Sequence, residues 1–96
     1  MVTRERLVIR KHAVEEMAAD GITVEDLLEV LNAGEVIRAY PEDRPFPSRL
    51  MFAFVAGRAM HVVAATDPET DRTFAITAYL PDPDLWETDF KTRRKR

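Results

Sequence analysis

The sequence predicts one α+β domain in which two N-terminal helices pack on one face of a four-stranded antiparallel sheet. Apolar residues recur with helical spacing before Gly34 and with the alternating spacing of strands after it. The chain of 96 residues is long enough to bury one core. No linker, internal repeat or low-complexity segment divides it, so residues 1–96 are expected to form a single domain.

Two helices are expected before Gly34. Residues 12–20 carry a compact apolar stripe, and Gly21 follows where a left-handed residue would end the helix. Thr23 is expected to cap the second helix, which ends near residues 32–34. Its apolar residues follow the spacing i, i+3, i+4 and i+7, as in Val24, Leu27, Leu28 and Leu31. The preceding segment, residues 5–10, could form a short strand or lead directly into the first helix.

Four strands are expected after Gly34, at residues 35–40, 49–55, 59–66 and 72–80. Three prolines exclude the segment 41–48 from a strand ladder. The last two connections are short enough to close hairpins. Beyond Leu80 the sequence predicts either a short helix, with Trp86 and Phe90 four residues apart, or an extended tail packed on the sheet.

Symmetrical closure of both hairpins would place His61 opposite Thr77 and Ala53, and Arg49 opposite Ala65. Side chains alternate between the two faces of a sheet, so this register defines two sets. The set expected beneath the helices is apolar: Leu50, Phe52, Phe54, Met60, Val62, Ala64, Phe74, Ile76 and Ala78. The set expected on the open face is smaller and partly polar: Arg49, Met51, Ala53, Val55, His61, Val63, Ala65, Thr73, Ala75, Thr77 and Tyr79.

The open face is the predicted working surface. His61 could act as general acid or base, because histidine titrates near neutral pH. Arg49 could hold a phosphate, and Tyr79 could donate a proton or stack on a base, with Thr77 beside them. Such a set would suit metal-independent cleavage of RNA, in which the 2′-hydroxyl is the nucleophile. The alternative is that His61 and Thr77 are cross-strand neighbours with a purely structural role.

His12 is the other candidate histidine, and Glu15 and Glu16 follow it at helical spacing. Two carboxylates and one imidazole do not complete a zinc motif, so neither a metal nor another cofactor is expected. His12 could instead orient against a glutamate at the start of the helix. Cysteine is absent, which excludes disulfides and thiolate chemistry.

Charge is distributed unevenly along the chain. Residues 1–11 form a basic lead-in of net charge +3, residues 91–96 form a basic end of +5 that is expected to be disordered, and residues 12–90 carry −11. A basic fold surface usually marks a nucleic-acid binder, so this distribution does not favour RNA. The sequence contains neither a membrane span nor a signal peptide, and we expect a cytoplasmic protein.

Several short motifs, taken in order, resemble one family. They are His12-Ala13, Gly21-Ile22, Gly34-Glu35-Val36-Ile37, residues 40–45 (YPEDRP), His61-Val62-Val63, Thr77-Ala78-Tyr79, and Pro81-Asp82 with Trp86. The combination resembles the bacterial and archaeal proteins grouped as domain of unknown function 4258. The layout is in turn similar to that of the RelE, ParE and BrnT toxins and of barnase-like ribonucleases. That similarity implies an endoribonuclease or ribosome-associated toxin whose candidate residues are His12, Arg49, His61, Thr77 and Tyr79.

Two functions are therefore expected as alternatives. The first is a toxin-like module that cleaves or binds RNA. The second is a non-catalytic module, on a degenerate toxin-like fold, that binds a cognate protein or forms a homodimer through an edge strand. The second predicts an exposed apolar patch around Met51, Val63 and Tyr79. The proximity of His12 and His61 would favour catalysis.

Overall fold

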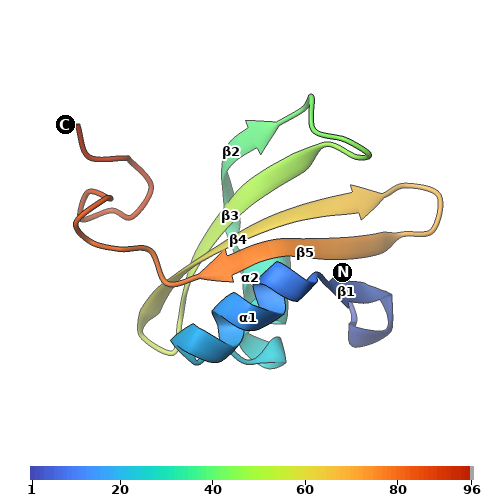
Figure 1. Ribbon diagram of the computed structural model, residues 1–96, viewed down its shortest axis with the longest axis horizontal. Coiled ribbons are helices and arrows are strands. Elements are labelled where there is room, and N and C mark those ends of the chain that lie inside the picture. Colours follow the sequence, from blue (N-terminus) through green and yellow to red (C-terminus); the bar gives the residue numbers. More distant parts are fainter. Residues whose placement is uncertain (96) are drawn as a thin grey trace.

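The structure of the protein is a computed structural model that describes residues 1–95 (Figure 1). A short 3₁₀ helix, Arg4–Arg6, precedes two α-helices and five strands. The helices are α1 (Lys11–Asp20) and α2 (Val24–Ala33). The strands are β1 (Leu7–Ile9), β2 (Glu35–Tyr40), β3 (Ser48–Val55), β4 (Arg58–Asp67) and β5 (Arg72–Tyr79). The α+β class is confirmed.

The sheet has five strands in the order β1–β5–β4–β3–β2. The four predicted strands pair antiparallel, but β1 adds a fifth strand parallel to β5, so the sheet is mixed. The predicted four-stranded antiparallel sheet was therefore incomplete. A three-residue strand is too short to show alternation, and a parallel neighbour leaves no hairpin signal in the sequence.

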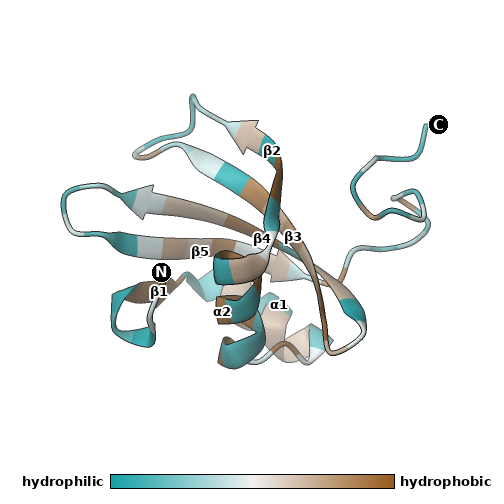
Figure 2. Ribbon diagram, turned by 180° about the vertical axis from the view of Figure 1, so that it is seen from behind, coloured by the Kyte–Doolittle hydropathy of each residue, from teal (hydrophilic) through white to brown (hydrophobic). Residues whose placement is uncertain are grey.

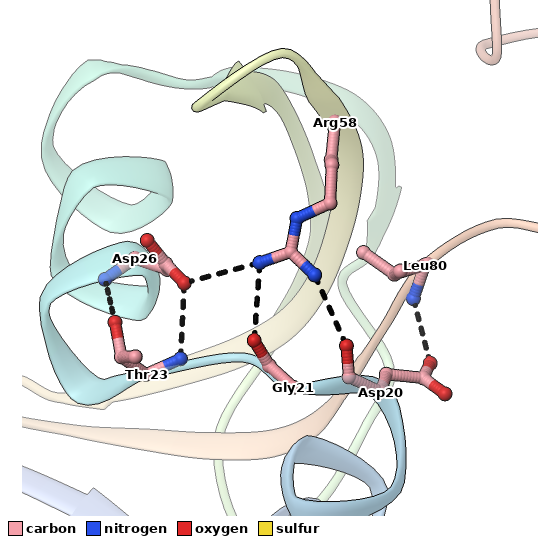
Figure 3. A network of polar contacts seen from close by, with 6 residues as sticks. All are labelled: Asp20, Gly21, Thr23, Asp26, Arg58 and Leu80. Carbon is pink, nitrogen blue, oxygen red and sulfur yellow. Dashed lines mark hydrogen bonds and ion pairs between the residues drawn. The ribbon is translucent and has the colours of Figure 1, made fainter.

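The ends of both helices follow the predicted capping residues. Gly21 has φ 68° and ψ 37°, the left-handed conformation that ends α1. Thr23 caps α2 reciprocally with Asp26, whose backbone N–H donates to the Thr23 hydroxyl. Arg58 reaches this junction from β4, donating to the carbonyls of Asp20 and Gly21 and pairing with Asp26 (Figure 3). This arginine therefore locks the connection between α1 and α2 onto the sheet.

Helix α1 lies along the part of β5 that β1 does not cover. The backbone N–H of Ala78 donates to the Glu16 carboxylate at 3.1 Å, and that of Leu80 donates to Asp20 at 3.0 Å. Two acidic side chains thus accept hydrogen bonds that a further strand would otherwise accept.

The register between β3 and β4 differs from the prediction by one residue. Ala56 and Gly57, with φ 53° and 79°, form a two-residue turn that places Val55 opposite Arg58. A shift of one residue exchanges the faces of β3 relative to β4. Met51 and Val55 therefore lie beneath the helices, and the predicted core residues of β3 face the other way: Leu50, Phe52 and Phe54. Such a turn is usually signalled by Asn-Gly or Asp-Gly, and alanine gives no such signal.

The register between β4 and β5 also differs. His61 lies opposite Tyr79 and Val63 opposite Thr77, after which a bulge brings Ala64 opposite Ala75. The predicted pairing of His61 with Thr77 is wrong by two residues, a shift that leaves the two on the same face. The bulge reverses the predicted faces of residues 73–76, because it inserts one extra residue into β5.

The core lies between the helices and one face of the sheet, which we call the helix face. Its largest fully buried apolar side chains come from α2 and β4: Leu27, Val30, Met60 and Val62. Strands β3 to β5 are coloured mostly in the hydrophobic range, and the loops and the tail in the hydrophilic range (Figure 2). No helix in residues 1–95 is long and apolar enough to cross a membrane.

Residues 81–95 form an extended tail with turns and no helix, so the second of the two predicted forms is the observed one. Trp86 is 4% exposed and pairs with Arg93 in an isolated bridge. The basic residues Lys91 and Arg94 pair with Glu35 and Glu87. Arg96 lies outside the described residues.

Candidate functional site

The face of the sheet opposite the helices, which we call the outer face, carries three rows of side chains across the strands. The strand pairings define these rows. The first contains Tyr40, Ser48, Ala65 and Phe74. The second contains Arg38, Leu50, Val63 and Thr77. The third contains Glu35, Phe52, His61 and Tyr79.

His61 is fully buried in the third row. Its Nε2 lies 2.7 Å from the carbonyl oxygen of Phe90, which can only accept, so Nε2 carries the proton. In the neutral ring Nδ1 then accepts from the hydroxyl of Tyr79 at 3.3 Å. Burial lowers the pKa of His61, and the hydrogen bond to Phe90 opposes that change. A neutral imidazole is therefore fixed in one tautomer beneath the tail.

The tail covers His61 by packing aromatic rings around it. The ring of Trp86 meets the imidazole edge to face, with centroids 4.5 Å apart, and Arg93 lies over the indole at 5.3 Å. Phe90 contacts Phe54 in the same manner at 6.3 Å. These contacts leave His61 unable to reach a substrate while the tail is docked.

Tyr79 and Thr77 share the outer face with His61, as the sequence predicts. Burial raises the pKa of Tyr79, and Tyr40 and Glu16 raise it further, while Arg93 lowers it. The Thr77 hydroxyl is buried without a hydrogen-bond partner in the described residues. Three of the five predicted site residues are thus brought together, around a histidine that the tail covers.

Arg49 does not join them, contrary to the predicted open face. The shifted register turns its side chain to the helix face, where Nη1 donates to the hydroxyl of Thr66 at 3.2 Å. His12 is also apart: it lies on α1, with its side chain 66% exposed and Nε2 3.5 Å from Glu16. One histidine is therefore buried under the tail and the other is exposed on a helix.

Four arginines that the sequence did not single out border the outer face: Arg10, Arg38, Arg44 and Arg93. All four are exposed, and none makes an ion pair within residues 1–95. By contrast, Arg4, Arg58 and Arg94 each pair with a carboxylate. The four unpaired arginines come from the N-terminal segment, β2, the β2–β3 loop and the tail.

Two hollows lie among these arginines. The Phe46 hollow, of about 330 Å³, is lined by Arg10, Arg44, Phe46 and Phe74 together with Asp43 and Ile76. In this hollow the phenyl rings of Phe46 and Phe74 are nearly parallel, and the guanidinium of Arg10 lies 4.7 Å from the centroid of the Phe74 ring. The Tyr79 hollow, of about 220 Å³, is lined by Arg38, Tyr40, Leu50, Tyr79, Trp86 and Arg93. Each hollow therefore combines two arginines with two or more aromatic rings.

The signal for this surface was present in the sequence but spread along it. Arg10 and Arg93 lie in the two basic ends, whereas Arg38 and Arg44 lie in the segment of net charge −11. The net charge of residues 12–90 does not reveal Arg38 and Arg44, because it also includes the carboxylates of α1 and α2, which lie on the other side of the sheet. Within residues 1–95, no three His, Cys, Asp or Glu side chains cluster as metal ligands would.

The fold and this face define a small α+β protein with an aromatic and basic sheet surface. The family model described as "Domain of unknown function (DUF4258)" matches residues 9–80, and the chain belongs to that family. The match ends at Leu80, so the tail lies outside it. No curated protein and no solved structure matches the chain significantly. The resemblance to RelE, ParE and BrnT toxins therefore stays a prediction.

Proposed function

We propose that the protein binds single-stranded RNA across the outer face of its sheet. The observation that carries this proposal is the set of four exposed, unpaired arginines beside aromatic rings on one face. Arginines neutralise phosphates, and flat aromatic rings stack on unpaired bases without requiring a particular sequence. A sheet with both groups on its solvent side suits a splayed single strand better than a duplex.

The distribution of the acidic residues supports the same face. The carboxylates of α1 and α2 lie on the helix side of the sheet: Glu15, Glu16, Asp20, Glu25, Asp26 and Glu29. These six carboxylates repel a polyanion on the helix side, whereas the outer face offers four unpaired arginines beside the carboxylates of Glu35 and Asp43. The net charge of −3 is therefore compatible with RNA binding on one side of the protein.

Binding is a better-supported function than cleavage. His61 is the only histidine on the outer face, and it is buried with both ring nitrogens engaged. Arg49, the predicted phosphate holder for cleavage, lies on the other side of the sheet. A general acid or base must come within hydrogen-bond reach of the proton it transfers, and neither geometry offers that.

Fluorescence anisotropy with a labelled ten-nucleotide RNA tests the proposal. We expect saturable binding, weakened at least about tenfold in the double variant Arg38→Gln/Arg93→Gln, because two phosphate contacts are lost. Arg4→Gln is the matched control, since Arg4 pairs with Glu25 of α2 and should leave the affinity unchanged. Equal affinities of the double variant and the wild type would refute RNA binding on this face.

A second candidate is self-association through β2. This strand is an edge of the sheet, and Val36 on it is 51% exposed. The patch predicted around Met51 is not exposed, because Met51 packs beneath the helices. Sedimentation of the wild type and of Val36→Lys decides this candidate: a dimer that the lysine abolishes supports it, and a wild-type monomer excludes it.

A further inference from the structure

Arg49 faces a hollow on the helix side of the sheet, separate from the outer face. The hollow measures about 290 Å³, and its polar lining includes Asn32, Arg49, Thr66, Asp71 and Thr73. We call it the Arg49 hollow. Strands β3, β4 and β5 supply the arginine and the two threonines, and the C-terminal turn of α2 supplies Asn32 and Leu31.

The guanidinium of Arg49 is partly buried without an opposite charge. Within residues 1–95 its one hydrogen bond goes to Thr66, whose hydroxyl lies 3.4 Å from that of Thr73. No carboxylate comes within ion-pair distance of it among these residues. Burial lowers the pKa of Arg49, the direction expected where desolvation acts on a guanidinium without an opposite charge beside it.

Burying an uncompensated charge costs free energy, and proteins normally compensate such a charge with a counter-ion or a bound ligand. Guanidinium has five N–H donors, and Arg49 uses one of them. The remaining donors and the hydroxyl of Thr73 are available to an oxyanion that enters the hollow. The fork of a guanidinium matches the two oxygens of a carboxylate in particular.

We propose that the Arg49 hollow binds the carboxylate group of a small organic acid. Leu31 and Val2 provide apolar contact for a short hydrocarbon part of the ligand. Asp71 is the only carboxylate in the lining and disfavours a doubly charged phosphate more than a singly charged carboxylate. The volume of about 290 Å³ lies just below the roughly 300–1,000 Å³ typical of ligand pockets, which limits the ligand to a few heavy atoms.

Nuclear magnetic resonance titration of the full chain tests the proposal with three probes: propionate, its neutral analogue propionamide, and inorganic phosphate. We expect saturable shifts of the backbone amides of Thr66 and Thr73 with propionate. Propionamide should leave them unmoved, and phosphate should bind more weakly. Saturation by propionamide, or tighter binding of phosphate, would overturn the assignment to a carboxylate.

Two variants assign the effect to the arginine. Arg49→Gln should weaken propionate binding at least about tenfold, and Arg49→Lys, which keeps the charge without the fork, should weaken it less. Arg38→Gln on the outer face is the control and should leave the propionate affinity unchanged. Arg49→Lys also covers the case in which Arg49→Gln does not fold. Unchanged affinity in a folded Arg49 variant would contradict the proposal, whatever the outcome of the RNA measurement.

Discussion

Protonation of His61 is expected to make the stability of the folded protein depend on pH. Histidine in an unfolded chain titrates near pH 6.5, and burial lowers the pKa of His61 in the folded protein. As the pH falls below about 6.5, the unfolded chain gains a proton at this residue before the folded protein does. The free energy of unfolding should therefore decrease from about pH 6.5 down to the folded pKa, by at most about 1.4 kcal/mol per pH unit.

Urea unfolding between pH 7.5 and 5.5 measures this dependence. His61→Gln should reduce the slope, because glutamine does not titrate and can still donate to the Phe90 carbonyl. His12→Gln is the matched control, since its side chain is exposed and makes one long contact, to Glu16. A slope that persists in His61→Gln would show that another group is responsible.

Gly34 is required for space rather than for backbone conformation. Its φ of −75° is open to any residue, but a Cβ there would lie 2.5 Å from the Val30 carbonyl oxygen and 2.8 Å from that of Phe52. Both are backbone atoms, so the clash cannot be relieved by a side-chain rotation. Gly34→Ala should destabilise the fold by about 1–3 kcal/mol.

Thermal unfolding of Gly34→Ala and Gly57→Ala distinguishes a steric clash of the added Cβ from the cost of a left-handed backbone conformation. Gly57 has φ 79° and open space around its Cβ position, so alanine there costs only the conformational term, about 1 kcal/mol. A Gly34 variant as stable as the wild type would show that α2 can move away from β3.

At the scale of elements, the tail is the segment that determines access to the histidine. Trp86→Ala removes the ring that packs on the imidazole at 4.5 Å and should undock the tail. Diethyl pyrocarbonate, followed by mass spectrometry, should then modify His61 as well as His12. In the wild type only the exposed His12 should react readily. Equal protection of His61 in both proteins would mean that the tail stays docked without Trp86.

The two helices and the four antiparallel strands could be predicted from the sequence, but the register between the strands could not. The apolar spacing of α2 and the capping residue Thr23 are local signals, and the structure confirms both. Register depends on turn conformation, and the turn at Ala56 has a positive φ that its sequence does not signal. A shift of one residue there moved Arg49 away from His61, so the predicted site was only partly assembled.

At the scale of the whole molecule, the outer face assembles from residues that the sequence keeps apart. Arg10 and Arg93 lie near opposite ends of the chain, and both border the outer face. Sequence reasoning placed Tyr79 there, but it counted Arg10 and Arg93 only as members of the two basic ends, because their convergence depends on the parallel pairing of β1 and on the path of the tail. Neither feature has a local signal.

Electrostatic binding on this face predicts a specific dependence on salt. For single strands the logarithm of the binding constant falls with the logarithm of salt concentration by about 0.7 per neutralised phosphate. Four arginine contacts therefore predict a slope near −2.8 for the RNA complex. Arg38→Gln should make the slope shallower by about 0.7, and Arg4→Gln, with its side chain paired to Glu25, should leave it unchanged.

Anisotropy titrations at salt concentrations from about 50 to 200 mM measure this slope directly. A slope near zero with intact binding would mean that the RNA is held by aromatic stacking alone. A slope that every arginine substitution alters equally, including Arg4→Gln, would mean that net charge rather than the outer face drives binding. RNA binding on the outer face requires the effect to belong to Arg10, Arg38, Arg44 and Arg93, because these four can exchange solvent counter-ions for phosphate without breaking an ion pair within residues 1–95.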